Sequence, residues 1–201
     1  TVMEDCRVLE ACREGKYTSV LVQTHDKKYV EYRTEHFVNA LGSGAGKLCD
    51  SMGIDAGLYP VRHQAFITRR LPMLGKHGTN LDMLIDRQDY KGFSAVYGQQ
   101  IAYTGQIIGC ASPKLDAMRI DKNLKVNTKA FLEIVSEMFS EWIPDLAGVG
   151  IQAVWAGYYT EPRYIVDPEL GLFVGMRGHG FMLSQYIARM YVDKLLGRPV
   201  P

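Results

Sequence analysis

Apolar and polar residues alternate with a period of two through residues 17–40, a pattern typical of half-buried strands. The segments are YTSVLVQT, YVEYR and TEHFVNA, and the polar turn HDKK separates the first from the second. The pattern predicts a meander of three strands. The third strand is expected to run into a glycine-rich turn at residues 41–46, followed by a short helix over residues 47–52. Open α/β folds use this order of elements to present backbone amides to a phosphate or ring.

Residues 57–112 are rich in β-branched and aromatic residues, interrupted by Gly, Pro and Asp. We expect about four antiparallel strands here, each with one packed and one polar face. The segments that carry this pattern are GLYPVRHQAFITRRLP, TNLDMLIDRQ, FSAVYGQQIAYT and QIIGCASP.

An amphipathic helix is predicted over residues 128–142, with Asn127 as its cap and Pro144 as its stop. Its apolar residues recur at helical spacing: Phe131, Ile134, Val135, Met138 and Trp142. The segment IQAVWAGYY then predicts a strand, and LGLFVGM predicts a short buried strand. A C-terminal helix is expected to reach Leu196 and to end at Gly197 and Pro199.

Two glycine clusters are the candidate ligand-binding segments. The first, GSGAGK at residues 42–47, is not a phosphate-binding P-loop, because Leu41 and Leu48 stand where that motif needs Gly and Ser or Thr. It is either a flexible strand-to-helix turn or a turn that lets the backbone approach a cofactor. The second, GMRGHG at residues 175–180, follows a buried strand and opens a helix. Its unpaired amides would favour negative charge or a polarised carbonyl; the alternative is a turn with positive φ at three glycines.

Composition excludes several classes of protein. The chain carries 23 basic and 22 acidic residues, a net charge of +1, which does not indicate a nucleic-acid partner. No apolar run is long enough to span a membrane, and residues 1–15 do not form a signal peptide. Four scattered cysteines predict reduced, mostly buried thiols and a cytoplasmic protein. Five histidines without ligand spacing predict no metal site.

Two stretches resemble the D-amino-acid oxidase superfamily, which includes sarcosine and glycine oxidases and dimethylglycine dehydrogenase. The stretch FVNALGSGAGKLCDSMGI, followed by LYPVRHQAFIT, is similar to the family's strand ending in VVNAAG, its helix and its P-x-R-x-Q segment. The stretch VWAGYYTEPRYIVDPELGLFVGMRGHGFMLS resembles the family's closing segment, with a W-x-G strand and a glycine motif before the last helix.

The resemblance implies an α/β (α+β) architecture with FAD as the cofactor and an amine or amino acid as the substrate. Residues 1–56 and 171–201 would form part of the FAD-binding domain, and residues 57–170 an antiparallel-sheet substrate domain. The family's N-terminal G-x-G-x-x-G fingerprint is absent, so we expect an incomplete enzyme and either a companion chain or self-association. No cysteine lies in the Trp155–Gly157 segment, so covalent flavin attachment there is not expected.

The resemblance also implies site residues. Ala40, Gly42 and Gly44 would lie beside the phosphate or ribityl part of FAD. The pyrimidine edge of the flavin would meet Gly175, Met176, Arg177, Gly178, His179, Gly180, Phe181 and Met182. Candidate substrate contacts are Arg62, which suits a carboxylate, with His63, Tyr158 and Tyr159.

Each of these roles has an alternative. Arg62 is equally consistent with a surface arginine, and the tyrosines with half-buried strand residues. For the whole chain, the alternatives are a non-catalytic partner that binds no flavin alone and a flavin-dependent 2-hydroxy-acid oxidoreductase. The altered segment Thr160-Glu161-Pro162, where the family often has T-P-D, leaves the substrate open.

Overall fold

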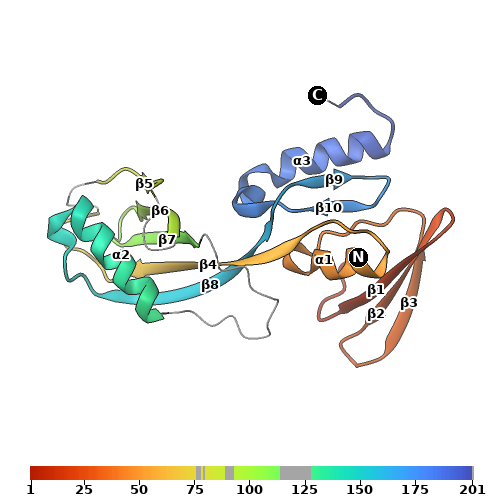
Figure 1. Ribbon diagram of the computed structural model, residues 1–201, viewed down its shortest axis with the longest axis horizontal. Coiled ribbons are helices and arrows are strands. Elements are labelled where there is room, and N and C mark those ends of the chain that lie inside the picture. Colours follow the sequence, from red (N-terminus) through yellow and green to blue (C-terminus); the bar gives the residue numbers. More distant parts are fainter. Residues whose placement is uncertain (76–77, 79, 89–92, 114–127, 201) are drawn as a thin grey trace. The chain divides into compact units, whose positions relative to one another are not determined.

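A computed structural model describes residues 1–75, 78, 80–88, 93–113 and 128–200 (Figure 1). The chain divides into two compact units, one formed by residues 1–60 and 159–201 and the other by residues 61–158. We call them unit 1 and unit 2 and describe each by itself. The sequence-based division placed the boundaries at residues 56/57 and 170/171.

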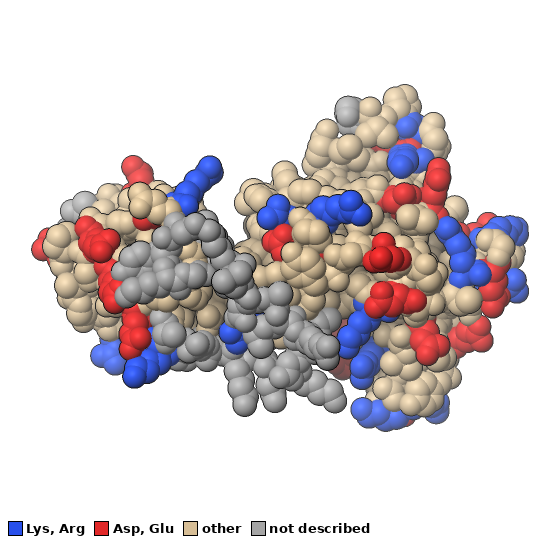
Figure 2. Space-filling model, in the orientation of Figure 1, with Lys and Arg blue, Asp and Glu red and all other residues tan. Residues whose placement is uncertain are grey.

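Unit 1 begins with a three-stranded antiparallel sheet in the order β1–β2–β3. The strands are β1 (Arg7–Glu14), β2 (Tyr17–Gln23) and β3 (Tyr29–Thr34). A small apolar cluster on this sheet contains Ala11, Val20, Val22 and Leu48. Basic and acidic side chains alternate over this unit on the face seen in Figure 2, in keeping with the near-zero net charge.

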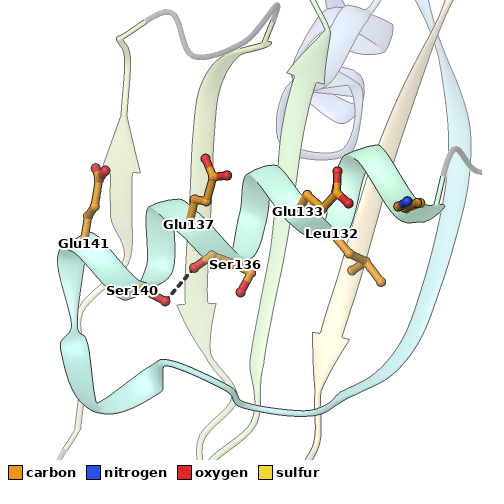
Figure 3. Close-up of a pocket in the computed structure, with 7 residues that line it drawn as sticks. Leu132, Glu133, Ser136, Glu137, Ser140 and Glu141 are labelled. Carbon is orange, nitrogen blue, oxygen red and sulfur yellow. Dashed lines mark hydrogen bonds between the residues drawn. The ribbon is translucent and has the colours of Figure 1, made fainter.

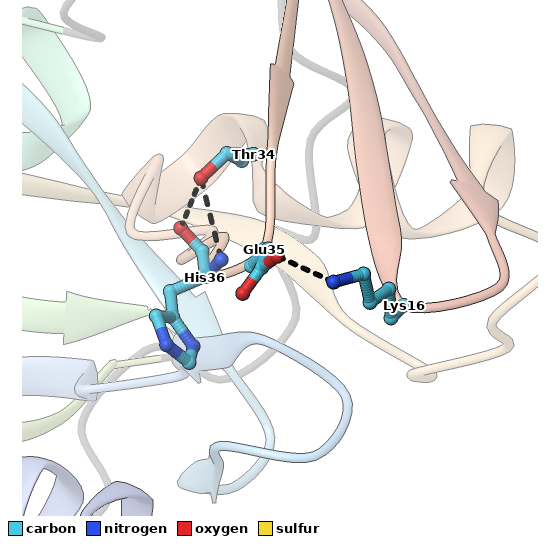
Figure 4. A network of polar contacts seen from close by, with 4 residues as sticks. All are labelled: Lys16, Thr34, Glu35 and His36. Atoms are coloured by element: carbon cyan, nitrogen blue, oxygen red, sulfur yellow. Dashed lines mark hydrogen bonds and ion pairs between the residues drawn. The ribbon is translucent and has the colours of Figure 1, made fainter.

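Two of the three strands predicted over residues 17–40 form, as β2 and β3, but the meander is completed by β1 and not by the third predicted strand. Strand β1 was missed because Ala11 is its only buried residue, so it shows no apolar alternation. The strand predicted over residues 34–40 does not form. The Thr34 hydroxyl donates to the carbonyl oxygen of His36 at 3.0 Å and accepts from its amide at 3.3 Å, which turns the chain out of β3 (Figure 4).

An exposed ion pair stands beside this turn. Lys16 Nζ lies 2.8 Å from Glu35 Oε1, joining the β1–β2 turn to the end of β3 (Figure 4). Hydrogen bonding to Lys16 lowers the pKa of Glu35, and the same bond raises the pKa of Lys16. Because both groups are exposed, this ion pair is expected to contribute little to the stability of the fold.

The rest of unit 1 is built around two further strands, β9 (Ile165–Asp167) and β10 (Leu172–Val174), which pair antiparallel. Asn39, from the segment predicted as a strand, forms a single parallel bridge to Leu172. A 3-10 turn, η1 (Gly42–Gly44), leads into α1 (Ala45–Ser51). The closing turn η3 (Arg177–His179) leads into α3 (Gly180–Leu195), which ends before Gly197 at φ +65°, as predicted.

Unit 2 contains a five-stranded sheet in the order β5–β6–β7–β4–β8. The four strands predicted over residues 57–112 and the strand predicted from IQAVWAGYY all form. They are β4 (Tyr59–Thr68), β5 (Leu84–Asp86), β6 (Phe93–Gln100), β7 (Ile107–Pro113) and β8 (Ile151–Glu161). The ends of β4 and β8 belong to unit 1.

Helix α2 (Thr128–Trp142) packs against one face of this sheet and ends before η2 (Pro144–Leu146), as predicted; the expected cap, Asn127, lies outside the described residues. Two glycines let rings lie directly on the strands. A side chain at Gly98 would overlap the ring of Phe139, and one at Gly109 would lie 2.5 Å from Cε1 of Phe66. The two rings meet edge to face with centroids 5.4 Å apart.

We expect Asn39→Ala to lower the free energy of unfolding by about 2–3 kcal/mol. Asn39 is 1% exposed; its Nδ2 donates to the Ala45 carbonyl oxygen at 3.1 Å, and its Oδ1 accepts from the Leu41 amide at 3.3 Å. The substitution leaves both backbone groups without these partners. Denaturant unfolding measures the change.

The matched control is Asn80→Ala. Asn80 is exposed, and its Oδ1 accepts a long, 3.4 Å hydrogen bond from Gln100. We expect a change within about 0.5 kcal/mol there. Equal effects at the two positions would contradict the role assigned to Asn39.

Candidate functional site

The two glycine clusters follow two segments that a single parallel bridge joins, between Asn39 and Leu172. The Asn39 amide donates to the Gly171 carbonyl oxygen at 2.7 Å, and the Phe173 amide donates to the Asn39 carbonyl oxygen at 3.0 Å. Because the two segments run parallel, their carboxyl ends point the same way. Gly42 follows Asn39 by three residues, and Gly175 follows Leu172 by three. Two glycine turns and two helix starts therefore meet at one edge, the position where open α/β folds bind ligands.

Apolar packing holds this edge in place. Leu172 and Val174 are each 1% exposed and pack with Ala45 and Cys49 of α1. Burial raises the pKa of the Cys49 thiol, which keeps it protonated. All four cysteines are free thiols, but only Cys49 and Cys110 are buried, so the expectation of mostly buried thiols holds for two of the four.

The first glycine turn leaves its backbone open. Gly42 has φ +55°, and a Cβ there would meet nothing within 4 Å. Gly44 has φ −84°, and its added Cβ would meet only Cβ of Leu41, at an ordinary 3.7 Å. Ala40 and Leu41 are exposed. The chain itself therefore requires a glycine at position 42 only for its φ angle, and the space beside this backbone is open to a ligand.

The closing cluster is more constrained than a plain turn. Gly175 has φ +76°, and a side chain there would overlap the carbonyl oxygen of Arg163. Gly178 carries the ring of Tyr159 against its backbone, because a Cβ would lie 2.8 Å from Cε2 of that ring. Gly180 has φ −56° and lies in ordinary helical conformation. The alternative of three left-handed glycines is therefore wrong; in the cluster, Gly175 and Arg177 have positive φ.

Arg177 combines a positive φ angle with an ion pair to Glu161. The Arg177 backbone has φ +50°, a strained region for a side chain with a Cβ. Its Nε lies 2.7 Å from Glu161 Oε2, and the glutamate side chain is only 17% exposed. Glu161 was not proposed from the sequence as a site residue. Its only signal was the departure from the T-P-D pattern, which pointed to the substrate and not to a side chain that anchors the closing turn.

The predicted site residues divide between the two units. Unit 1 brings together the first glycine turn, the closing cluster and Tyr159. Arg62, His63 and Tyr158 belong to unit 2. Arg62 and His63 are consecutive in β4, so their side chains point to opposite faces of the sheet. By the same alternation Arg62 shares the face of Phe66, which α2 covers, and His63 lies on the other face.

A flavin nucleotide suits the edge in unit 1. The first turns of η1 and η3 present backbone amides that precede any helical hydrogen bond, and the open backbone at Gly42 allows close approach. Apolar side chains also stand exposed there: Phe181 is 102% exposed and Met182 is 69% exposed. Such a cofactor requires backbone amides to contact its phosphates or its reduced ring. It also requires apolar surface on which the ring can lie. Among the described residues, no group of His, Cys, Asp and Glu could hold a metal ion.

Comparison with protein families shows which family the chain resembles throughout its length. The model of the family described as FAD-dependent oxidoreductase matches residues 1–194. The chain belongs to this family. FAD is therefore the family's cofactor, as expected, and the mixed helix and strand architecture is confirmed.

Solved structures share the fold of this FAD-dependent oxidoreductase domain. Glycine oxidase from Geobacillus kaustophilus is 18% identical, with a TM-score of 0.67 over 96% of this chain and 49% of that chain. Iminodiacetate oxidase from Chelativorans sp. BNC1 is 13% identical, with a TM-score of 0.67 over 97% and 49%. L-amino acid deaminase from Proteus vulgaris, with its specific insertion deleted, is 17% identical, with a TM-score of 0.62 over 97% and 46%.

The chain thus spans about half the length of the solved structures that it matches. A search of curated proteins gave no match. Within the described part of the chain, no helix is both long and apolar enough to cross a bilayer. The cytoplasmic location stays a prediction.

The pH dependence of stability tests the environment of His63. Burial lowers the pKa of His63 from 6.5 to about 4. Between these values the unfolded chain binds a proton that the folded chain does not. Stability from this group is therefore complete above pH 6.5 and is lost as the pH falls towards 4, by at most about 3 kcal/mol.

We expect His63→Gln to flatten the stability profile between pH 7 and 4.5, measured by denaturant unfolding at each pH. His36→Gln, at an exposed histidine, is the control and should follow the wild-type curve. An unchanged profile in His63→Gln would show that burial does not perturb His63.

Proposed function

We propose that this chain forms part of an FAD-dependent enzyme that oxidises an amine or amino acid. The observation that carries the proposal is the shared edge in unit 1, where the parallel bridge between Asn39 and Leu172 aligns two glycine turns. The family match over residues 1–194 supports it, as do the names of the similar structures, which are oxidases and a deaminase of amino acids and related amines.

At this edge the chain's backbone would hold the cofactor. Ala40, Gly42 and Gly44 would line the phosphate or ribityl part, and residues 175–182 the pyrimidine edge of the ring. FAD, when bound, supplies the redox chemistry as a hydride acceptor. Negative charge on the reduced ring would be stabilised by the N-terminus of α3, by about 1 kcal/mol, and by the guanidinium of Arg177. Glu161 keeps that guanidinium in place.

Unit 2 would supply the substrate contacts. His63 is neutral above about pH 4, so in the physiological range its ring can donate one hydrogen bond and accept another without adding charge. Arg62 offers a planar guanidinium that suits a carboxylate, but on the opposite sheet face from His63. One ligand on one face of β4 can therefore contact only one of the two side chains directly. We assign the substrate to the face of the sheet that α2 does not cover. His63 lies on this face and is therefore favoured among the predicted contacts, with Tyr158 as a further candidate.

Helix α3 gives unit 1 an apolar surface that a partner would cover. It packs on one side, where Tyr191 meets Phe173 edge to face at 6.0 Å and the helix lies alongside β9 and β10 (Figure 1). The large apolar residues exposed on this helix and directly after it are Phe181, Met182, Leu183, Tyr186, Val192 and Leu196. Polar residues such as Gln185, Arg189 and Lys194 are exposed on the helix as well, but so many exposed large apolar side chains are typical of an interaction surface. We infer that a further part of the flavin-binding fold, in a companion chain or a second copy, contacts this helix.

Sedimentation tests this contact. We expect the purified chain to associate at tens of micromolar, because exposed apolar surface of this kind favours association. The double substitution Tyr186→Ser and Leu196→Ser, at side chains that are each 55% exposed, should shift the chain towards monomer without changing its unfolding midpoint. A clean wild-type monomer would contradict the inferred contact.

A matched pair of glycine variants tests the cofactor edge. Gly42 and Gly53 stand at the two ends of α1 with φ +55° and +70°, and a Cβ at either position would meet nothing within 4 Å. Alanine should therefore cost each about 1 kcal/mol of backbone strain. We expect Gly42→Ala to lose bound flavin and Gly53→Ala to retain it, measured by visible absorbance of the flavin-loaded assembly.

Thermal unfolding of both variants separates stability from cofactor binding. If Gly42→Ala keeps its full flavin content while both variants lose the same stability, the first glycine turn does not contact the cofactor. A colourless wild-type assembly, with the chain and its companion both present, would remove the proposed function altogether.

A further inference from the structure

Unit 2 contains a partly open apolar cavity of about 210 Å³ between α2 and the sheet. Its walls come from β4, β7, β8 and α2, and from the loops around Leu71 and Val149. Most of the wall is fully buried: Phe66 is 1% exposed, Val135 2% and Ile107 3%. Interiors of this size of domain are normally packed without space for a molecule larger than water.

Two aromatic rings form the floor of this cavity. Phe66 and Phe139 both line it and meet edge to face. They lie against Gly109 and Gly98, where an added Cβ would overlap the rings. The positions of both rings therefore depend on these two glycines. A third ring entering it could meet both phenylalanines at the distances that aromatic pairs prefer.

The wall carries no charge. Of the residues that line the cavity, Thr68 and Ser136 alone are polar, and the Thr68 hydroxyl already accepts a hydrogen bond from the Ile107 amide at 2.9 Å. An ionised ligand would lose its hydration without compensation. The zwitterionic amino acids of the proposed function are excluded for the same reason, so this cavity is distinct from that site.

Two lining residues that the cavity shares with the protein surface point to an opening at one side of α2. Leu132 and Ser136 line both this cavity and a hollow on the outer surface of the helix. Figure 3 shows them along one edge of α2, with Glu133, Glu137 and Glu141 along the opposite edge. The surface hollow is lined by these three glutamates and one lysine, Lys129, so its net charge disfavours an approaching anion. Size, lining and entrance together select a small neutral molecule.

We propose that this cavity binds a neutral aromatic molecule of single-ring size. An apolar protein cavity of about 150 Å³ is sufficient for benzene and stays dry when empty. The cavity in unit 2 is larger and has two phenyl rings in its wall. The proposal does not rest on flavin binding, and it holds whether or not unit 1 contacts a cofactor.

The test titrates the full chain with benzene and, separately, with benzoate, and follows thermal unfolding. Benzene should raise the midpoint with a dissociation constant on the order of 1 mM, and benzoate at the same concentration should not. Val135→Phe, which places a ring inside the cavity, should weaken the benzene response about tenfold or more. Val154→Phe is the control, because Val154 packs against the same core without lining the cavity, and it should respond like the wild type.

Methyl NMR of the wild-type chain locates the site even if a variant does not fold. Ring-current shifts on adding benzene should appear at Ile107, Val135 and Ile151 and not at Val20 and Val22 of unit 1. No midpoint shift with benzene, an equal shift with benzoate, or NMR changes confined to residues outside the cavity would each overturn the proposal.

Discussion

The backbone of Asn39 makes two hydrogen bonds on which the geometry of the cofactor edge depends. Its amide donates to the Gly171 carbonyl oxygen, and its carbonyl oxygen accepts from the Phe173 amide. They join segments more than 130 residues apart and make them parallel, so the turns that follow both segments meet at one edge. The Asn39 side chain reinforces this arrangement by binding the Ala45 carbonyl and the Leu41 amide on either side of the first glycine turn. Burying a side-chain amide costs free energy unless its nitrogen and oxygen form hydrogen bonds, and here the neighbouring backbone supplies a partner for each.

Glycine has two different uses in this chain. At Gly42 it permits a backbone conformation and leaves open space, where a ligand could approach the main chain. At Gly98 and Gly109 of unit 2, as at Gly178 of unit 1, it permits close packing of an aromatic ring on the backbone. The first use exposes backbone amides, and in unit 2 the second fills the core while holding the rings at the wall of the apolar cavity. Both follow from the missing Cβ, and the surrounding elements decide which applies.

Charge and burial divide the proposed work between the units. The ion pair of Arg177 with the largely buried Glu161 fixes a guanidinium beside the closing glycine cluster, where a reduced flavin ring would carry negative charge. Burial keeps His63 neutral on the α2-free face of β4, where a substrate would need a hydrogen-bonding group. The apolar surface of α3 belongs to neither role, and its exposure is consistent with a chain that spans about half the length of the structures sharing its fold.

The sequence by itself determined the strands of unit 2, helix α2, the closing helix and the two glycine turns, because these depend on local periodicity and on Gly and Pro. Its similarity to the oxidase family also led to the cofactor, through motifs that lie close together in the chain. It missed β1, because most residues of this strand are exposed and show no apolar alternation. It also predicted a strand from Thr34 onward, where a side-chain hydrogen bond turns the chain instead. Only the tertiary structure decided that Asn39 pairs with Leu172, that Glu161 holds Arg177 and that a cavity lies under α2. These features depend on contacts between residues distant in sequence, and local patterns carry no information about which distant partner a residue meets.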